Sequence, residues 1–169
     1  PVVKVGVVHP IESYWLHWGP AQQTSLIREQ MEENFQNLTQ WLLFGTIDFD
    51  FICESLLPEQ CEKGAVPFQV GEMAYDVVIV PACETLRGTT YQRLKEFQEA
   101  GGRLVFLGEP PKYLDAKESD LPKALYEKSE HISFDRSSVL KALDSVRLVE
   151  LRKADGSYMD HLIYQMRQD

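Results

Sequence analysis

Three short runs of apolar residues are the feature that most constrains how this chain can fold. Residues 2–9, 75–80 and 103–107 consist mainly of valine, isoleucine, leucine and phenylalanine. Runs of this length with little polar alternation are typical of strands covered on both faces, as in parallel sheets. Pro10 and Pro81 end the first two runs, and Gly108 follows the third. The sequence therefore predicts at least three buried strands.

The stretches between these runs predict helices. Residues 24–44 place apolar side chains three or four positions apart, and Gly45 is a suitable C-terminal stop. Residues 89–92 match the capping box that starts a helix, and the glycine pair at 101–102 is a good end for it. Residues 11–20 are rich in aromatic side chains and are expected to form a loop.

A fourth strand is predicted at residues 48–53, where Phe49 and Phe51 alternate with Asp48 and Asp50. The order strand, helix, strand, strand, helix, strand follows the βαβ rule. It predicts an α/β fold of flavodoxin-like type, a three-layer sandwich with a mainly parallel sheet between helices.

The last third of the chain is more polar. Two weak helices are expected at 120–128 and 136–145, and the dipeptide Asp155-Gly156 is a strong hairpin signal between two short strands. The sequence predicts an α/β domain at residues 1–146. Residues 147–169 are predicted to form an edge hairpin or the start of a following β-sandwich domain.

The charge balance excludes several partners. Lysine and arginine total 17, aspartate and glutamate total 26, and the net charge is -9. Without a basic run, binding to nucleic acid or to an anionic membrane is not expected. No apolar stretch reaches the roughly 20 residues of a membrane span, and no signal peptide is visible, so a cytoplasmic location is expected. The opening Pro-Val-Val-Lys-Val, without methionine, suggests an excised piece of a longer protein.

Metal and cofactor sites are not expected either. The three cysteines are widely spaced, no C-x-x-C occurs, and the four histidines are scattered. The chain contains neither the G-x-G-x-x-G pattern nor a Walker motif, and residues 82–88 do not form a cradle for a flavin phosphate.

Ligands of open α/β sheets bind beyond the carboxyl ends of the strands. Here those ends are residues 9–18, 53–55, 82–88 and 108–111. Aromatic side chains beside a carboxylate suit sugar binding, contact with another domain or subunit, or capping of the core. The candidate contact residues are Glu12, Tyr14, Trp15, Trp18, Glu84 and Arg87. Glu84 and Arg87, three positions apart, are also placed to pair with each other as loop supports.

No catalytic residue is assigned. Cys83 follows a strand and is an alternative nucleophile, but no G-x-C-x-G surrounds it and the adjacent Glu84 would raise the pKa of its thiol. The acid pairs Asp48/Asp50 and Glu12/Glu54 have the residue types of glycosidase chemistry, although structural carboxylates are the commoner outcome.

Taken in order, several segments resemble one family. They are V-x-V-G-V-V-H-P-I-E-S-Y-W, a long helix, D-F-D-F-I-C-E, Y-D-V-V-I-V-P-A, a helix ending in G-G, and R-L-V-F-L-G. Together they resemble the glutamine-amidotransferase-like domain of multidomain glycoside hydrolases, such as the trimerisation domain of family 42 β-galactosidases and the module of α-L-rhamnosidase-like enzymes. The resemblance spans residues 1–111 and implies a class I glutamine-amidotransferase-like fold.

In catalytic relatives, a cysteine follows the strand after the G-G helix, and here that position falls at Gly108 or Glu109. The His-x-Glu pair of a triad is also missing, since Ile132 and Ser133 follow His131. The resemblance thus implies a non-catalytic accessory domain of a glycosidase whose catalytic carboxylates lie on a separate barrel. Its implied partners are that barrel, a following β-sandwich, further copies of the chain, and carbohydrate.

Three hypotheses remain at this point. The first is the accessory domain. The second is a stand-alone cysteine hydrolase or amidotransferase-like enzyme that uses Cys83. The third is a flavodoxin-like module that binds a small molecule. The first is preferred.

Overall fold

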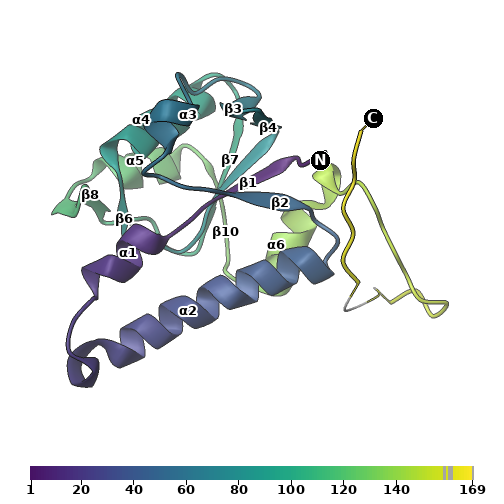
Figure 1. The fold of residues 1–169 in the computed structure, drawn as a ribbon, viewed down its shortest axis with the longest axis horizontal. Helices are drawn as coiled ribbons and strands as arrows, with labels where there is room; N and C mark the ends of the chain where they lie inside the picture. The colour runs from purple at the N-terminus through teal and green to yellow at the C-terminus, as the bar shows by residue number, and fades with distance from the viewer. Residues whose placement is uncertain (158, 160–161, 169) are drawn as a thin grey trace.

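A computed structural model describes residues 1–157, 159 and 162–168. Its centre is a five-stranded sheet, β10-β7-β5-β1-β2, in which all four strand pairings are parallel (Figure 1). Numbered along the chain, this order is 2-1-3-4-5, which is compatible with a flavodoxin-like fold. The bounds of the strands are Val5–Val8 for β1, Phe49–Ile52 for β2, Val77–Val80 for β5, Arg103–Leu107 for β7 and Glu130–Ile132 for β10. The predicted α/β class and mainly parallel sheet are confirmed.

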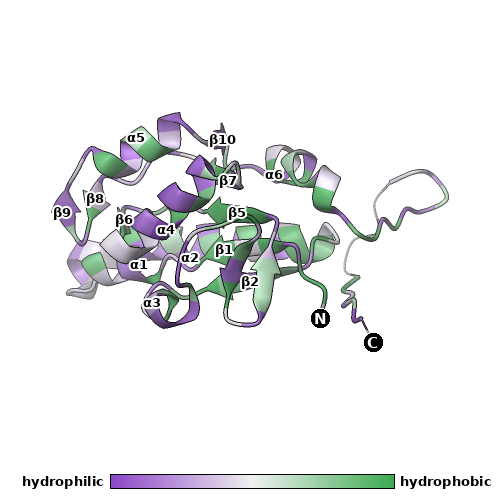
Figure 2. Cartoon of the chain, turned by 90° about the horizontal axis from the view of Figure 1, so that it is seen from above, coloured by the Kyte–Doolittle hydropathy of each residue, from purple (hydrophilic) through white to green (hydrophobic). Residues whose placement is uncertain are grey.

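Helices cover both faces of this sheet. The long helix α2 (Ala21–Phe44) and α6 (Arg136–Ala142) pack on one face, while α3 (Leu57–Gln60), α4 (Gly88–Glu99) and α5 (Leu121–Glu127) pack on the other. In Figure 2, β1 and β5 are coloured mainly as hydrophobic, whereas the helices mix both colours. This is the pattern of central parallel strands covered on both sides by amphipathic helices.

Two apolar clusters form the core, one on each side of the sheet. Because side chains alternate along a strand, neighbouring residues of β5 belong to different clusters. The first cluster joins Val78 and Val80 to Phe97 of α4, and the second joins Ile79 to Leu42 of α2.

Smaller elements surround this frame. They are the helix α1 (Ile11–Leu16), the hairpin strands β3 (Phe68–Val70) and β4 (Met73–Tyr75), the short strands β6 (Thr85–Leu86), β8 (Tyr113–Leu114) and β9 (Lys117–Glu118), and the 3-10 turn η1 (Asp144–Val146). Strand β6 pairs in parallel with β8, and β8 pairs antiparallel with β9.

The two predicted helix ends that rest on glycine are confirmed. Gly45 caps α2, and the Gly102 N–H donates to the Phe97 carbonyl oxygen at 2.8 Å after α4. The predicted capping box is wrong, because α4 begins at Gly88 with Arg87 in the N-cap position. The expected loop at residues 11–20 is also corrected, since it contains α1.

The C-terminal segment shows a turn at the predicted place. The Lys153 N–H donates to the Ser157 carbonyl oxygen at 2.7 Å, and the Met159 N–H donates to Leu151 at 3.1 Å. No helix or strand of the described part extends past Val146. The second predicted strand includes positions 158, 160 and 161, which lie outside the described residues, so the hairpin and the boundary at 146 stay predictions.

Candidate functional site

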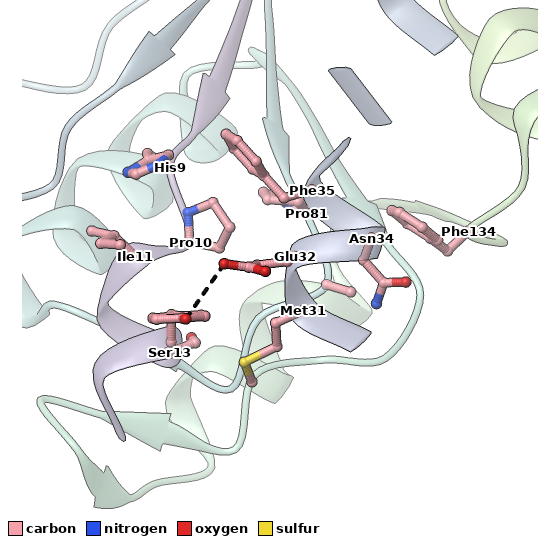
Figure 3. Close-up of a pocket in the computed structure, with 12 residues that line it drawn as sticks. His9, Pro10, Ile11, Ser13, Met31, Glu32, Asn34, Phe35, Pro81 and Phe134 are labelled. Carbon is pink, nitrogen blue, oxygen red and sulfur yellow. Dashed lines mark hydrogen bonds between the residues drawn. The ribbon is translucent and has the colours of Figure 1, made fainter. Parts of the chain in front are cut away.

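The topological switch point lies between β1 and β5. From β1 the chain passes through α2 to β2, and from β5 it passes through α4 on the opposite face to β7. Because the connections that follow these two neighbouring strands lie on opposite faces of the sheet, a crevice opens at the carboxyl ends of the strands. Doubly wound folds bind their ligands in this crevice. A cavity of about 240 Å³ lies at this point (Figure 3). It is lined by His9, Pro10, Ile11, Ser13, Tyr14, Met31, Glu32, Asn34, Phe35, Pro81, Ala82 and Phe134.

The length of α2 explains why it forms a wall of this cavity. Its 24 residues span about 36 Å, whereas the four residues of β1 span about 13 Å. The C-terminal half packs on the sheet through Leu38 and Leu42. The middle of the helix, with Glu32 and Phe35, therefore stands at the strand ends.

Helix α1 is fastened to the segment after β5 by Ser13. The buried Ser13 hydroxyl accepts hydrogen bonds from the N–H groups of Glu84 at 2.9 Å and Thr85 at 3.1 Å. These bonds place the neighbouring α1 side chains against residues 84–87.

Two side-chain contacts follow from that placement. Arg87 donates from Nε to Oε1 of Glu12 at 2.7 Å, and Nε2 of His17 lies 2.9 Å from Oε1 of Glu84. The expected pairing of Glu84 with Arg87 is thus corrected, because Arg87 pairs with Glu12 of α1 and Glu84 pairs with His17, which directly follows α1.

The acid pairs have structural partners. Glu54 is 1% exposed, accepts from the Arg87 N–H at 2.8 Å, and has its pKa raised, mainly by burial. Asp50 accepts from the Tyr75 hydroxyl at 3.0 Å. Burial is also the main cause that raises the pKa of Asp48. The contacts of Glu54 and Asp50 hold these two carboxyl groups in place as parts of the scaffold.

The three cysteines differ in environment. Burial raises the pKa of the Cys83 thiol, and the carboxylates of Glu54 and Glu84 raise it further. Burial also raises the pKa of Cys61. By contrast, the hydrogen bond between Cys53 and Ser55, 3.2 Å from sulfur to oxygen, lowers the pKa of Cys53. Cys83 therefore has little thiolate character near neutral pH.

The aromatic candidates separate into two groups. Tyr14 lines the cavity and its hydroxyl donates to Oε1 of Glu32 at 3.4 Å. Trp15 and Trp18 are 55% and 71% exposed, and the guanidinium of Arg28 lies 5.2 Å from the centre of the Trp18 ring. The structure thus brings Glu12 and Arg87 together and Tyr14 to the cavity, and it leaves both tryptophans at the surface.

The strand-end segments predicted from the sequence, residues 9–18 and 82–88, include His9 and Tyr14 of the cavity lining. They do not include the side of the cavity formed by α2, with Glu32 and Asn34. The length of α2 relative to the strands was the signal that could have identified them.

The turn after β7 has a left-handed backbone at Gly108, whose φ is 76°. A residue with a side chain is strained in that conformation. A Cβ atom built at Gly108 would lie 3.8 Å from the Cβ atoms of Ala82 and Phe134, so this turn borders the cavity.

Comparison with protein-family models, with curated proteins and with solved structures gave no match. In the described part of the chain, no three histidine, cysteine, aspartate or glutamate side chains are grouped as a metal site would require. Nor does any described helix combine the length and apolar character needed to cross a bilayer.

Proposed function

We propose that this chain is a non-catalytic accessory domain of a larger enzyme that cleaves glycosidic bonds, and that it has a glutamine-amidotransferase-like fold. In this proposal, the end of the molecule formed by α1 and the first turns of α2 contacts other domains or subunits of that enzyme. The motif order described above is the basis for the class of parent enzyme.

One observation carries the assembly role. Large apolar side chains are exposed on α1, on the turn that follows it and on the start of α2: Trp15, Leu16, Trp18, Leu26 and Ile27. Leu26 is 80% exposed and Trp18 is 71% exposed. Figure 1 shows this end of α2 extending away from the sheet. Neighbouring exposed apolar residues of this size are typical of a surface that another protein covers.

The strand ends support a role without covalent chemistry. By the resemblance, the position at which catalytic amidotransferases hold their nucleophile falls at Gly108 or Glu109. The neighbouring thiol of Cys83 is held in its protonated form by burial and by two carboxylates. Arg87 is engaged by Glu12 of α1, and Glu84 is engaged by His17, which directly follows α1.

Turnover measurements test this proposal. The purified chain should release no nitrophenol from 4-nitrophenyl galactosides, rhamnosides or glucosides above the rate in buffer. The variants Glu12→Gln and Glu54→Gln serve as controls. If the wild-type chain releases nitrophenol and either variant abolishes this release, the chain has a catalytic carboxylate. That result would overturn the proposal.

The cavity at the switch point favours a second role, the binding of a small molecule. This role is compatible with the first, because the cavity and the exposed apolar side chains use different residues.

A further inference from the structure

The cavity beside α2 combines polar groups and an apolar wall on fixed elements. Its walls come from the end of β1, the start of α1, the middle of α2 and the turns after β5 and β10. The core holds β1 and α2 in place, and the hydrogen bonds of Ser13 hold α1 in place. A pocket that is already formed in this way favours a specific ligand.

Three polar side chains, Glu32, Asn34 and His9, line the cavity. Figure 3 shows Glu32 reaching from α2 toward α1, where it accepts the hydrogen bond from Tyr14. A carboxylate accepts about four hydrogen bonds, so Glu32 keeps capacity for a ligand. The Asn34 side-chain oxygen accepts from Gln30 at 3.1 Å, which directs the Asn34 amide nitrogen to other acceptors. His9 supplies a ring that both donates and accepts.

The rest of the lining is apolar and partly aromatic. The Phe35 ring stacks on Phe51, 5.0 Å between centroids, and meets the edge of His9 at 5.2 Å. Phe134 and Pro81 belong to this part of the lining. A ligand that fits must therefore present hydroxyl or amide groups to the polar side chains and C–H groups to the aromatic ring.

The charges of the cavity lining exclude anionic ligands. None of the described residues that line the cavity is lysine or arginine, and Glu32 contributes a negative charge. Burial lowers the pKa of His9, so its ring is neutral near pH 7. A phosphate or carboxylate would lose its hydration here without gaining a cation. At about 240 Å³ the cavity also lies below the usual 300–1,000 Å³ range of drug-sized ligands, which favours a single ring.

We propose that this cavity binds one neutral, polyhydroxylated ring, a monosaccharide unit, with Glu32 bonded to its hydroxyl groups and Phe35 against its C–H face. The inference goes beyond the accessory role and rests on the lining of the cavity. The accessory role is tested by turnover and the cavity by binding, so one can fail without the other.

Calorimetric titration of the purified chain with galactose, rhamnose and glucose tests the inference. At least one of these sugars should bind with a Kd of about 1 mM, as expected for a ligand of this size. The phosphate ester of the same sugar should bind at least about tenfold more weakly, because it brings a charge to a site without a cation.

The matched variants are Glu32→Gln and Glu33→Gln, neighbours on α2 that are both exposed, of which only Glu32 lines the cavity. Glu32→Gln should raise the Kd about tenfold, since it weakens hydrogen bonds to a charged acceptor. Glu33→Gln should leave the Kd within about twofold of wild type, a change too small for a lost hydrogen bond. No binding by about 10 mM sugar, equal Kd values for Glu32→Gln and wild type, or tighter binding of the phosphate ester would each overturn the inference.

Discussion

At the scale of single residues, the strand ends hold three glutamates in three different environments. Glu12 is paired with Arg87, Glu84 is paired with His17, and Glu54 is buried against the Arg87 backbone. Residue type alone would allow any of them to act as an acid or base. Their contacts instead show side chains engaged in holding α1 and the residue 84–87 segment together.

Glu54 provides a prediction about pH. Burial raises the pKa of its carboxyl in the folded chain, so the folded state binds a proton more readily than the unfolded state. The stability due to this group is therefore greatest below the unfolded pKa and falls as the pH rises toward the folded pKa. Glu54→Gln should raise the urea midpoint near pH 7, and the gain should shrink toward about pH 4.

Urea titrations of the wild-type chain and of Glu54→Gln at several pH values measure the difference in midpoint. Glu59→Gln, which changes an exposed residue of α3, is the control. If the urea midpoint of Glu54→Gln is raised equally at all pH values, or is lowered near pH 7, burial of the Glu54 carboxylate does not destabilise the folded state.

The cysteines provide a second prediction. Because its hydrogen bond to Ser55 lowers the pKa of Cys53, while the pKa values of Cys61 and Cys83 are raised, iodoacetamide should modify Cys53 first. Ser55→Ala should slow that reaction. Peptide mass spectrometry after short labelling times gives the order, and the unfolded chain, where all three thiols should react alike, is the control. Rapid modification of Cys83 in the folded chain would support the cysteine-enzyme alternative instead.

At the scale of elements, α1 depends on one hydroxyl group. Ser13→Ala would leave the N–H groups of Glu84 and Thr85 without their acceptor at a buried position. The expected loss of unfolding free energy is about 2 kcal/mol. Chemical denaturation measures it, with Ser137→Ala on the exposed side of α6 as the control. Equal losses for the two variants would show that Ser13 does not fasten α1.

The packing of α4 depends on a close approach between its backbone and the backbone at Gly64. A Cβ atom at Gly64 would overlap the carbonyl oxygen of Arg93, whereas one at Gly19 would meet only ordinary contacts. Gly64→Ala should therefore cost about 3 kcal/mol of unfolding free energy, because backbone must move to admit the methyl group. The same denaturation experiment on Gly19→Ala should show a far smaller change. A tolerated Gly64→Ala would mean that α4 does not approach this closely.

The helices and strands that the sequence predicts correctly are those with a long periodic pattern or an unbroken run of apolar residues. Strand β7 matches its apolar run, and α2 ends at Phe44 as its apolar spacing and Gly45 predict. Strand β10 was missed because its three residues, Glu-His-Ile, lie at the sheet edge and carry no apolar run. The hairpin of β3 and β4 was missed because each strand has only three residues.

The candidate site was only partly predictable for a related reason. The rule that ligands bind at strand ends identified Glu12, Tyr14 and Arg87 correctly as neighbours of that edge. It could not identify Glu32 or Asn34, because their position depends on how far α2 extends past the sheet. That distance follows from packing between elements far apart in the sequence.

At the scale of the whole molecule, α2 links the two proposed roles. Its C-terminal half belongs to the core, its middle forms a wall of the cavity, and its first turns expose Leu26 and Ile27. A ligand at Glu32 and a protein partner at Leu26 would therefore contact the same helix within two turns. The carboxyl end of the sheet is thus the face at which the account expects this chain to bind without catalysing a reaction.

One nuclear magnetic resonance titration tests that claim most directly, because it follows the protein and the ligand in the same tube. The ¹⁵N-labelled chain is titrated with the aryl glycoside of whichever sugar binds best. We expect shifts of the amide signals of residues 9, 11–14 and 31–35, with the anomeric signal of the glycoside unchanged over hours. Replacement of that signal by the free sugar, or amide shifts confined to another face, would contradict this expectation.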